Sequence, residues 1–153
     1  IKTVNVETAE QMFKATQKNL PVDVAIFTAA VADFKILEKS NIKIKKKNEL
    51  TIKLEKNIDI LNYVSNHNSM RPRLVVGFAA ETDNLEKNAI KKLKDKNCDM
   101  IIANDISDQK IGFNSDDNEV TIFYKNDKYE KLYSKNKTLI SEEIVERVNS
   151  LLN

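Results

Sequence analysis

Short apolar runs alternate with amphipathic stretches along most of the chain. The apolar runs predict four strands, at residues 2–6, 22–28, 73–79 and 99–103. Helices are predicted between them, one after a capping box formed by Thr8 and Gln11, and two more at about 58–67 and 84–97. The run at 22–28 is apolar almost throughout, as expected for a strand buried on both faces of a parallel sheet.

The rest of the chain is less regular. A long lysine-rich loop is predicted to lead to a short strand at 50–54, and residues 119–125 and 128–134 are predicted to form a hairpin. Ser141 is the predicted cap of a last amphipathic helix. The alternation predicts one α/β domain over residues 1–153, with a Rossmann-like open sheet, mostly parallel, helices on both faces and a C-terminal hairpin plus helix.

In such a sheet, ligands bind outside the carboxyl ends of the strands. Three segments are therefore expected to converge, "AAVAD", "GFAAET" and "ANDIS", each rich in small residues and containing an acid. The small residues allow a flat group to lie against the backbone. Asp33, Glu81 and Asp105 supply acceptors for base edges, hydroxyls or a hydrated Mg²⁺.

Composition narrows the function classes. Lys and Arg number 25 against 23 Asp and Glu, a formal charge of +2, so no global field favours nucleic acid or a membrane surface as partner. No apolar run approaches about 18 residues, and we expect a cytoplasmic protein in which Cys98, the single cysteine, is a buried thiol. Only two glycines are present, which excludes a Gly-rich phosphate loop.

Two groups of lysines are candidate phosphate ligands. The basic run at 43–47 is either a solvated edge or part of a mobile lid over phosphates. Lys92 and Lys96 lie four apart and share a helix face, although cations also favour a helix C-terminus. Asp33 either caps a turn or contacts a ligand. His67 stands alone, and the sequence has no metal-ligand spacing and no Ser/His/Asp set.

Taken in order, these segments resemble the phosphopantothenoylcysteine synthetase family, the ligase domain that most bacteria fuse behind a flavin-dependent decarboxylase in coenzyme A biosynthesis. The resemblance covers nearly the whole chain. It rests on "AAVADF", on "KIKK" beginning ten residues after Asp33, and on "NIDIL", "VGFAAET", "KLKDKNCDMIIANDIS" and "GFNSDDN". Each motif is weak alone, whereas the ordered set is specific.

The resemblance implies a two-step ligation in a homodimer. The carboxylate of 4′-phosphopantothenate attacks the α-phosphate of CTP, which releases pyrophosphate and leaves an acyl-cytidylate; the amine of L-cysteine then displaces CMP. Mg²⁺ and lysines neutralise the triphosphate, and FMN is expected only where the decarboxylase domain is present. Strand 50–54 and the hairpin at 119–134 are the surfaces expected to pair across a two-fold axis.

The same resemblance assigns residues to the reaction. It implies that Lys43 is the mobile-loop lysine used on the triphosphate and in catalysis, and that Ala30 lies where the acyl intermediate passes. The nucleotide contacts that it implies are Phe27, Thr28, Ala29, Asp33, Lys43, Ile58, Asp59, Ile60, Leu61, Phe78, Lys92 and Lys96. No metal ligand is assigned.

Two features depart from the family pattern. The family motif "NPDI" is "NIDI" here, so Ile58 replaces a proline in a segment recognised mainly through its backbone. The family's N-terminal strand, Gly-containing turn and Asn-bearing loop have no match in residues 1–153, and we expect part of the substrate site to be lacking.

Three alternative functions remain open. They are an ATP-using form of the ligase, a catalytically incomplete nucleotide-binding or dimerisation fragment, and a Rossmann-type oxidoreductase. The absence of a Gly-rich fingerprint disfavours the oxidoreductase.

Overall fold

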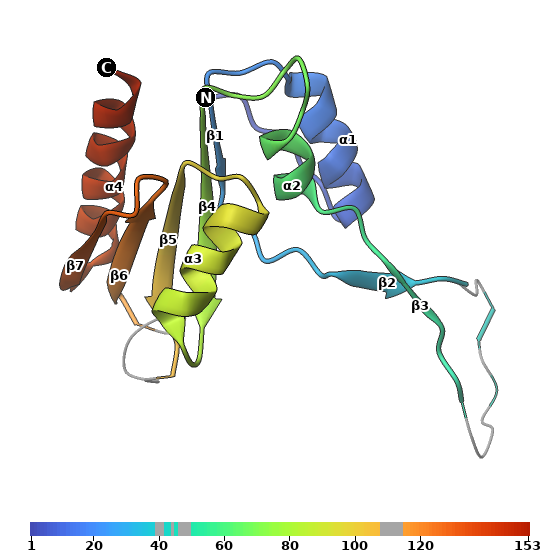
Figure 1. Ribbon diagram of the computed structural model, residues 1–153. Helices are drawn as coiled ribbons and strands as arrows, with labels where there is room; N and C mark the ends of the chain where they lie inside the picture. Colours follow the sequence, from blue (N-terminus) through green and yellow to red (C-terminus); the bar gives the residue numbers. More distant parts are fainter. Residues whose placement is uncertain (39–41, 44, 46–49, 108–114) are drawn as a thin grey trace. The chain divides into compact units, whose positions relative to one another are not determined.

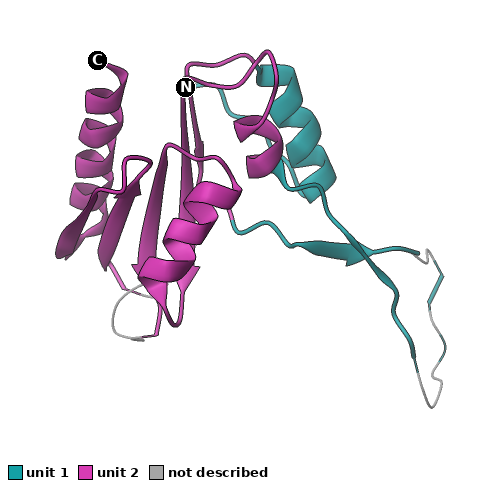
Figure 2. Cartoon of the chain, in the orientation of Figure 1, with its two compact units in different colours: residues 1–20, 30–60 teal, residues 21–29, 61–153 magenta. Residues whose placement is uncertain are grey.

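The computed structural model describes residues 1–38, 42–43, 45, 50–107 and 115–153. The helices and strands in these ranges are, in chain order, α1 (Ala9–Asn19), β1 (Val24–Phe27), β2 (Phe34–Ile36), β3 (Leu54–Lys56), α2 (Ile60–Ser65), β4 (Leu74–Glu81), α3 (Leu85–Asp95), β5 (Met100–Asp105), β6 (Asp117–Tyr124), β7 (Tyr129–Asn136) and α4 (Lys137–Leu152) (Figure 1). The chain divides into two compact units, residues 1–20 with 30–60 and residues 21–29 with 61–153 (Figure 2). The single domain expected over the whole chain stays a prediction.

The second unit is built on a five-stranded sheet in the order β1-β4-β5-β6-β7. The strands β1, β4 and β5 run parallel, and β6 and β7 extend the sheet as an antiparallel hairpin. Helix α3 packs on one face and α4 on the other, as Figure 1 shows. The predicted α/β class, with helices on both faces and a C-terminal hairpin plus helix, is confirmed.

Alternation of side chains along the central strands divides the core into two layers. The layer under α3 contains Val75, Ala79, Ala89, Leu93, Cys98, Ile101, Ala103 and Phe123. The layer under α4 contains Leu74, Val76, Met100, Ile102, Val120, Ile122, Leu132, Ile140, Ile144 and Val148. Because β4 and β5 are buried on both faces, the hydrophobic effect holds their register. Cys98 is fully buried, as predicted.

Polar side chains tie the amino ends of β4 and β5 together. The carboxylate of Asp99 accepts a hydrogen bond from Arg71 Nη2 at 2.9 Å and another from the Val75 amide at 2.8 Å. Arg71 also donates to the carbonyls of Ser65 and Asn97. These bonds satisfy the polar groups of the loops that enter both strands. The network holds the amino edge of the sheet, opposite the edge where the site is predicted.

The N-terminal segment only partly follows the prediction. The capping box is confirmed, because the Gln11 amide donates to Thr8 Oγ1 and the Thr8 amide donates to Gln11 Oε1. Residues 2–6, predicted as a strand, belong to none of the sheets among the described residues. An alternating apolar run becomes a strand only where a neighbour pairs with its backbone, and no described strand does so here.

Helix α4 begins earlier than predicted. Its cap is Asn136, whose Oδ1 accepts from the Thr138 amide at 2.9 Å. The predicted cap, Ser141, instead lies inside the helix and its hydroxyl donates to the Thr138 carbonyl. Asn caps a helix as well as Ser does, and it ends β7 directly, so the strand passes into the helix without a loop. None of the helices in the described ranges has the length and apolar character that crossing a membrane requires.

The first unit contains a two-stranded antiparallel ribbon made of β2 and β3. The predicted strand 50–54 overlaps β3 only at Leu54. No strand was predicted at β2, whose last residue, Ile36, is the first residue of the predicted loop. Cross-strand pairing explains the difference. Ile36 lies opposite Leu54, and Lys35 forms an ion pair with Glu55 at 3.1 Å.

A charged cluster joins α4 to the hairpin of β6 and β7. Arg147 on α4 donates to both carboxylate oxygens of Glu130 on β7 at 3.1 to 3.3 Å, and the Tyr124 hydroxyl donates to the same carboxylate. The hydrogen bonds from Arg147 hold the pKa of Glu130 below its ordinary value. Burial raises the pKa of Tyr124. Glu130 is therefore ionised and Tyr124 neutral at neutral pH.

The lowered pKa of Glu130 makes this cluster a source of pH-dependent stability. Because the folded pKa lies below the unfolded one, the contribution is complete above the unfolded value of about 4.3 and is lost as the pH falls through the folded value. We expect urea unfolding to show a smaller loss of unfolding free energy between about pH 5 and about pH 3 in Arg147→Met than in the unchanged protein. Glu142→Gln, exposed on α4, should keep the original profile; a profile unaltered by Arg147→Met would contradict the role of the cluster.

Candidate functional site

The carboxyl ends of β4 and β5 meet, as predicted. Glu81 and Asp105 are register partners at the ends of the two strands, and the Ile106 amide donates to the Glu81 carbonyl at 2.9 Å. On the other side of β4, the last residue of β1, Phe27, is in register with Gly77. Two of the three predicted segments, "GFAAET" and "ANDIS", therefore lie side by side at one edge of the sheet.

The third segment, "AAVAD", belongs largely to the other unit. Phe27, Thr28 and Ala29 lie in the unit of the sheet, whereas residues 30–33 lie in the unit of the ribbon. Thr28 and Ala29 are exposed, and Phe27 packs against the core layer under α3. The convergence of Asp33 with the sheet edge stays a prediction.

Asn57 joins two of the predicted nucleotide segments within the first unit. Its amide donates to the carbonyl of Asp33 at 2.8 Å, and its Nδ2 donates to the carbonyl of Ala32 at 2.7 Å. Because Asn57 is the first residue of "NIDIL", these bonds bring the exposed Asp33 next to the start of the segment 58–61. Asn57 belongs to a predicted motif, but its type and position in the sequence did not indicate this role.

Residues 58–61 lead into α2. Ile58 and Asp59 are exposed, Ile60 is the first helical residue and is only 4% exposed, and Leu61 is half-buried against the layer under α3. A Cβ added at Gly77 would lie 3.1 Å from Leu61 Cδ2 and 2.8 Å from Ile101 Cδ1, so glycine permits this close packing of α2 on β4. The exposed backbone at Ile58 and Asp59, before α2, remains the part of this segment that is predicted to contact the nucleotide.

Helix α3 carries a polar stripe made of Asn88, Lys92 and Lys96, one helical turn apart. The ammonium group of Lys92 donates to the carbonyl of Phe78 on β4 at 2.7 Å. The Lys96 amide donates to the Lys92 carbonyl at 3.0 Å and ends the helix, so the two predicted lysines share a face. Both are half-buried. Lys92 is therefore held against β4 rather than being a fully solvated cation.

Asn88 is a site residue that the sequence reasoning missed. Its Nδ2 donates to Glu81 Oε2 at 2.9 Å and to the Asp83 carbonyl at 3.1 Å. The signal was its position four residues before Lys92, which puts it on the same helix face. The stripe on α3 thus runs beside β4, because Asn88 contacts the side chain of Glu81 at the end of the strand and Lys92 contacts the carbonyl of Phe78.

Phe78 does not present its ring to this stripe. Side chains alternate along β4, and the ring of Phe78 packs against the core layer under α4. Lys92 comes from the opposite face and reaches only the backbone of Phe78. The two residues that the resemblance assigns to the nucleotide are therefore neighbours through a carbonyl, with the aromatic ring on the other side of the sheet.

The remaining predicted residues are exposed. Ala30 and Lys43 both lie in the first unit, and most of the basic run, at 44 and 46–47, is outside the described residues. Residues 112–114 of "GFNSDDN" are also outside them. The catalytic roles of Ala30 and Lys43 stay predictions.

Asp105 and His67 are engaged with the protein itself. No three His, Cys, Asp or Glu side chains gather there in a way that would hold a metal ion. Asp105 accepts from the Ser107 hydroxyl at 2.6 Å and from the Ser107 amide at 2.8 Å, and these bonds lower its pKa. His67 Nδ1 accepts from the Met70 amide at 3.1 Å, as expected of a structural histidine.

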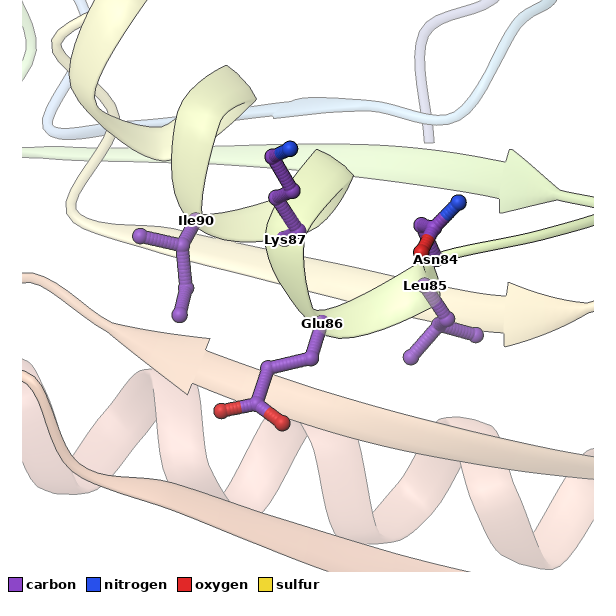
Figure 3. A pocket seen from close by; sticks show the side chains of 5 residues that line it. All are labelled: Asn84, Leu85, Glu86, Lys87 and Ile90. Carbon is purple, nitrogen blue, oxygen red and sulfur yellow. The ribbon is translucent and has the colours of Figure 1, made fainter.

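An open groove lies along the first half of α3. It is lined by Asn84, Leu85, Glu86, Lys87 and Ile90, as Figure 3 shows. None of the predicted nucleotide residues lines it. Leu85 and Ile90 pack against the core layer under α3. We therefore assign the groove to the packing of α3 rather than to a nucleotide.

The sequence of this chain is similar to a known protein family and to several of its members. A family model for the DNA/pantothenate metabolism flavoprotein C-terminal domain matches residues 1–152. The chain is 39% identical over 150 residues to the coenzyme A biosynthesis bifunctional protein CoaBC of Haemophilus influenzae, covering 97% of this chain and 37% of that protein. It is 43% identical over 130 residues to CoaBC of Escherichia coli, covering 82% of this chain and 32% of that protein.

The fold has a counterpart among solved structures. The crystal structure of the C-terminal domain of a coenzyme A biosynthesis bifunctional protein CoaBC matches with a TM-score of 0.76 and 34% identity, over 99% of this chain and 66% of that one. The chain spans between about a third and two fifths of the length of these curated relatives. The chain therefore shares its fold with one part of these proteins, and the activity of the whole proteins does not follow from that similarity.

The bond between Lys92 and the Phe78 carbonyl is testable by stability. Lys92→Met keeps the aliphatic stem and removes the donor, and we expect the unfolding free energy to fall by about 1 kcal/mol. Lys91→Met, exposed on the same helix, is the matched control and should change it by less than about 0.5 kcal/mol. Urea unfolding followed by circular dichroism measures both. Equal small changes in the two variants would show that the contact adds no stability.

Proposed function

Because the chain belongs to the family of DNA/pantothenate metabolism flavoprotein C-terminal domains, we propose that it is the ligase of coenzyme A biosynthesis that joins 4′-phosphopantothenate to L-cysteine with CTP. The resemblance to phosphopantothenoylcysteine synthetases is confirmed at the level of the family. The name of the CoaBC relatives describes them as bifunctional, which supports fusion to a decarboxylase domain in the whole protein. FMN would belong to that domain alone.

The observation that carries the proposal is the position of Lys92. Its ammonium group is bonded to the Phe78 carbonyl in the carboxyl half of β4, and open α/β sheets bind ligands at the carboxyl ends of their strands. An ammonium carries three protons, so the single bond to Phe78 leaves donors for phosphate oxygens. Lys96 adds a second cation one turn away. This arrangement favours a polyphosphate as ligand.

In the proposed reaction the protein positions charged reactants and neutralises them. The carboxylate of 4′-phosphopantothenate attacks the α-phosphate of CTP, pyrophosphate leaves, and cysteine's amine then displaces CMP from the acyl-cytidylate. Lys43, Lys92 and Lys96 contact the triphosphate, Asp33 contacts the cytidine, and Ala30 leaves room for the acyl group. Orientation and charge neutralisation supply most of the acceleration in such transfers.

Mg²⁺ is expected to accompany the triphosphate. Mg²⁺ demands six oxygen ligands in near-octahedral geometry, and no three acids or histidines gather to hold an ion among the described residues. The described residues therefore do not fit a metal site held by the protein itself.

The nucleotide assignment is tested by calorimetric titration of CTP and of ATP, each with Mg²⁺, into this chain and into its Asp33→Asn variant. We expect CTP to bind more tightly than ATP, and Asp33→Asn to weaken CTP binding by about tenfold or more, because a charge-assisted hydrogen bond is lost. Asp23→Asn, exposed before β1, is the control and should bind CTP unchanged. Tighter binding of ATP would favour the ATP-using form of the ligase, and binding of neither nucleotide would contradict the proposed function.

We also propose that the ribbon of β2 and β3 pairs two copies of the chain. One of its faces carries Phe34, Ile36 and Leu54, which are 47 to 57% exposed, with Lys56 at its end, opposite Phe34. The other face carries the ion pair of Lys35 with Glu55. An isolated two-stranded ribbon is marginally stable in water, and an exposed apolar face needs a cover. A second copy supplies a matching apolar face by two-fold symmetry.

The pairing of two copies is tested by sedimentation over a range of protein concentrations. We expect the unchanged chain to sediment as a dimer and Leu54→Lys to sediment as a monomer, because a charge then interrupts the apolar face. Lys53→Gln, next to it in sequence and exposed, should remain dimeric. A monomeric unchanged chain at every concentration would refute the proposal.

A further inference from the structure

Glu81 is the carboxylate that the sheet edge presents. It is half-buried, ends β4, and by alternation lies on the same side as Ala79, toward α3. Its Oε2 accepts from Asn88 Nδ2 at 2.9 Å, whereas its Oε1 has no hydrogen-bond partner among the described residues. The side chain is held at one oxygen and open to a ligand at the other.

Asn88 determines this orientation. Its Nδ2 faces two acceptors, the carboxylate of Glu81 and the carbonyl of Asp83, so the amide nitrogen rather than the amide oxygen must point toward them. One turn further along α3, Lys92 donates to the Phe78 carbonyl. A carboxylate and an ammonium group therefore lie along the same strand. The carboxylate belongs to Glu81 and the ammonium group contacts Phe78, and these two positions are about 10 Å apart along β4.

The three substrates of the proposed reaction differ in charge. CTP and 4′-phosphopantothenate are anions and match lysines, whereas L-cysteine carries an ammonium group that needs an acceptor. Asp105, the register partner of Glu81, already accepts two hydrogen bonds from Ser107. Both bonds from Ser107 end on Oδ1 of Asp105, so each of the two acids keeps one oxygen without a partner among the described residues. Asp105 is exposed, whereas Glu81 is half-buried, and a half-buried carboxylate attracts an opposite charge more strongly.

We propose that Glu81 binds the ammonium group of L-cysteine and that Asn88 is its positioning residue, an inference that rests on the proposed ligase function. As the amine attacks the acyl carbon, a C–N bond forms and the C–O bond to the α-phosphate breaks. CMP leaves with the electron pair of that bond. An ammonium nitrogen has no lone pair, so one proton first passes from it to the carboxylate of Glu81. The second proton, which the nitrogen loses as the amide forms, passes to the phosphate of the leaving CMP, so the step needs no other reactant.

The contacts favour an ammonium group over a metal ion at Glu81. An asparagine coordinates Mg²⁺ through its oxygen, whereas Asn88 directs its NH₂ group at the carboxylate. An ammonium group needs only a few acceptors, and an open carboxylate oxygen provides one of them.

The test separates the two steps of the reaction in this chain and in its variants. Pyrophosphate release from CTP with 4′-phosphopantothenate reports the first step, and the dependence of CMP release on cysteine concentration reports the second. We expect Glu81→Gln to raise the KM for cysteine by about tenfold or more, with the first step and its Mg²⁺ dependence changed less than about twofold. Asn88→Ala should raise the same KM by a smaller factor. Glu86→Gln, an exposed acid on α3, should alter neither step.

Each result decides between the inference and its competitors. An unchanged KM for cysteine in Glu81→Gln would overturn the inference and leave the proposed function intact. Loss of the first step in Glu81→Gln, with a raised requirement for Mg²⁺, would assign Glu81 to the metal–nucleotide complex and likewise overturn it. Absence of pyrophosphate release in the unchanged chain would favour the catalytically incomplete fragment over the ligase, which would contradict the proposed function for this chain and the inference with it.

Discussion

Burial of both faces of β4 and β5 is the constraint on which the rest of the sheet depends. Val75 and Val76 are both fully buried on opposite faces of β4, so the strand cannot slip by one residue without exchanging the two core layers. Each buried aliphatic side chain contributes roughly 1.5 to 3 kcal/mol, and several misplaced together would exceed the net stability of a domain. The pairing of Glu81 with Asp105 at the carboxyl edge therefore follows from the core.

The same apolar packing places the polar stripe of α3. Ala89 and Leu93 are buried against the sheet, and helical periodicity then turns Asn88 and Lys92 toward the neighbouring flank, beside β4. The methyl group of Ala89 lets the helix approach the sheet closely. A lysine side chain can consequently reach the Phe78 carbonyl. The polar groups at this edge are thus positioned by apolar residues that do not themselves contact the proposed ligands.

Sequence patterns predicted the central strands, α3 and the hairpin of β6 and β7, and failed for residues 2–6 and for the ribbon of β2 and β3. β4, α3 and β5 lie within about two residues of their predicted bounds, because a long apolar or amphipathic run is visible in a local window. Residues 2–6 have a similar pattern, yet no described strand pairs with them. The ribbon of β2 and β3 arises from contacts between segments far apart in the sequence, such as Ile36 with Leu54, which no local window contains.

For the candidate site, the motifs could be located from the sequence, whereas their contacts could not. Glu81 and Asp105 were equivalent as acids at strand ends, but the structure separates them. A serine two residues after Asp105 folds back onto its carboxylate and closes an Asx-type turn. After Glu81 a helix begins instead, and its second turn brings Asn88 over one carboxylate oxygen. The reactivity of a strand end therefore depends on the element that follows it, which is why residue type and position alone did not distinguish the two acids.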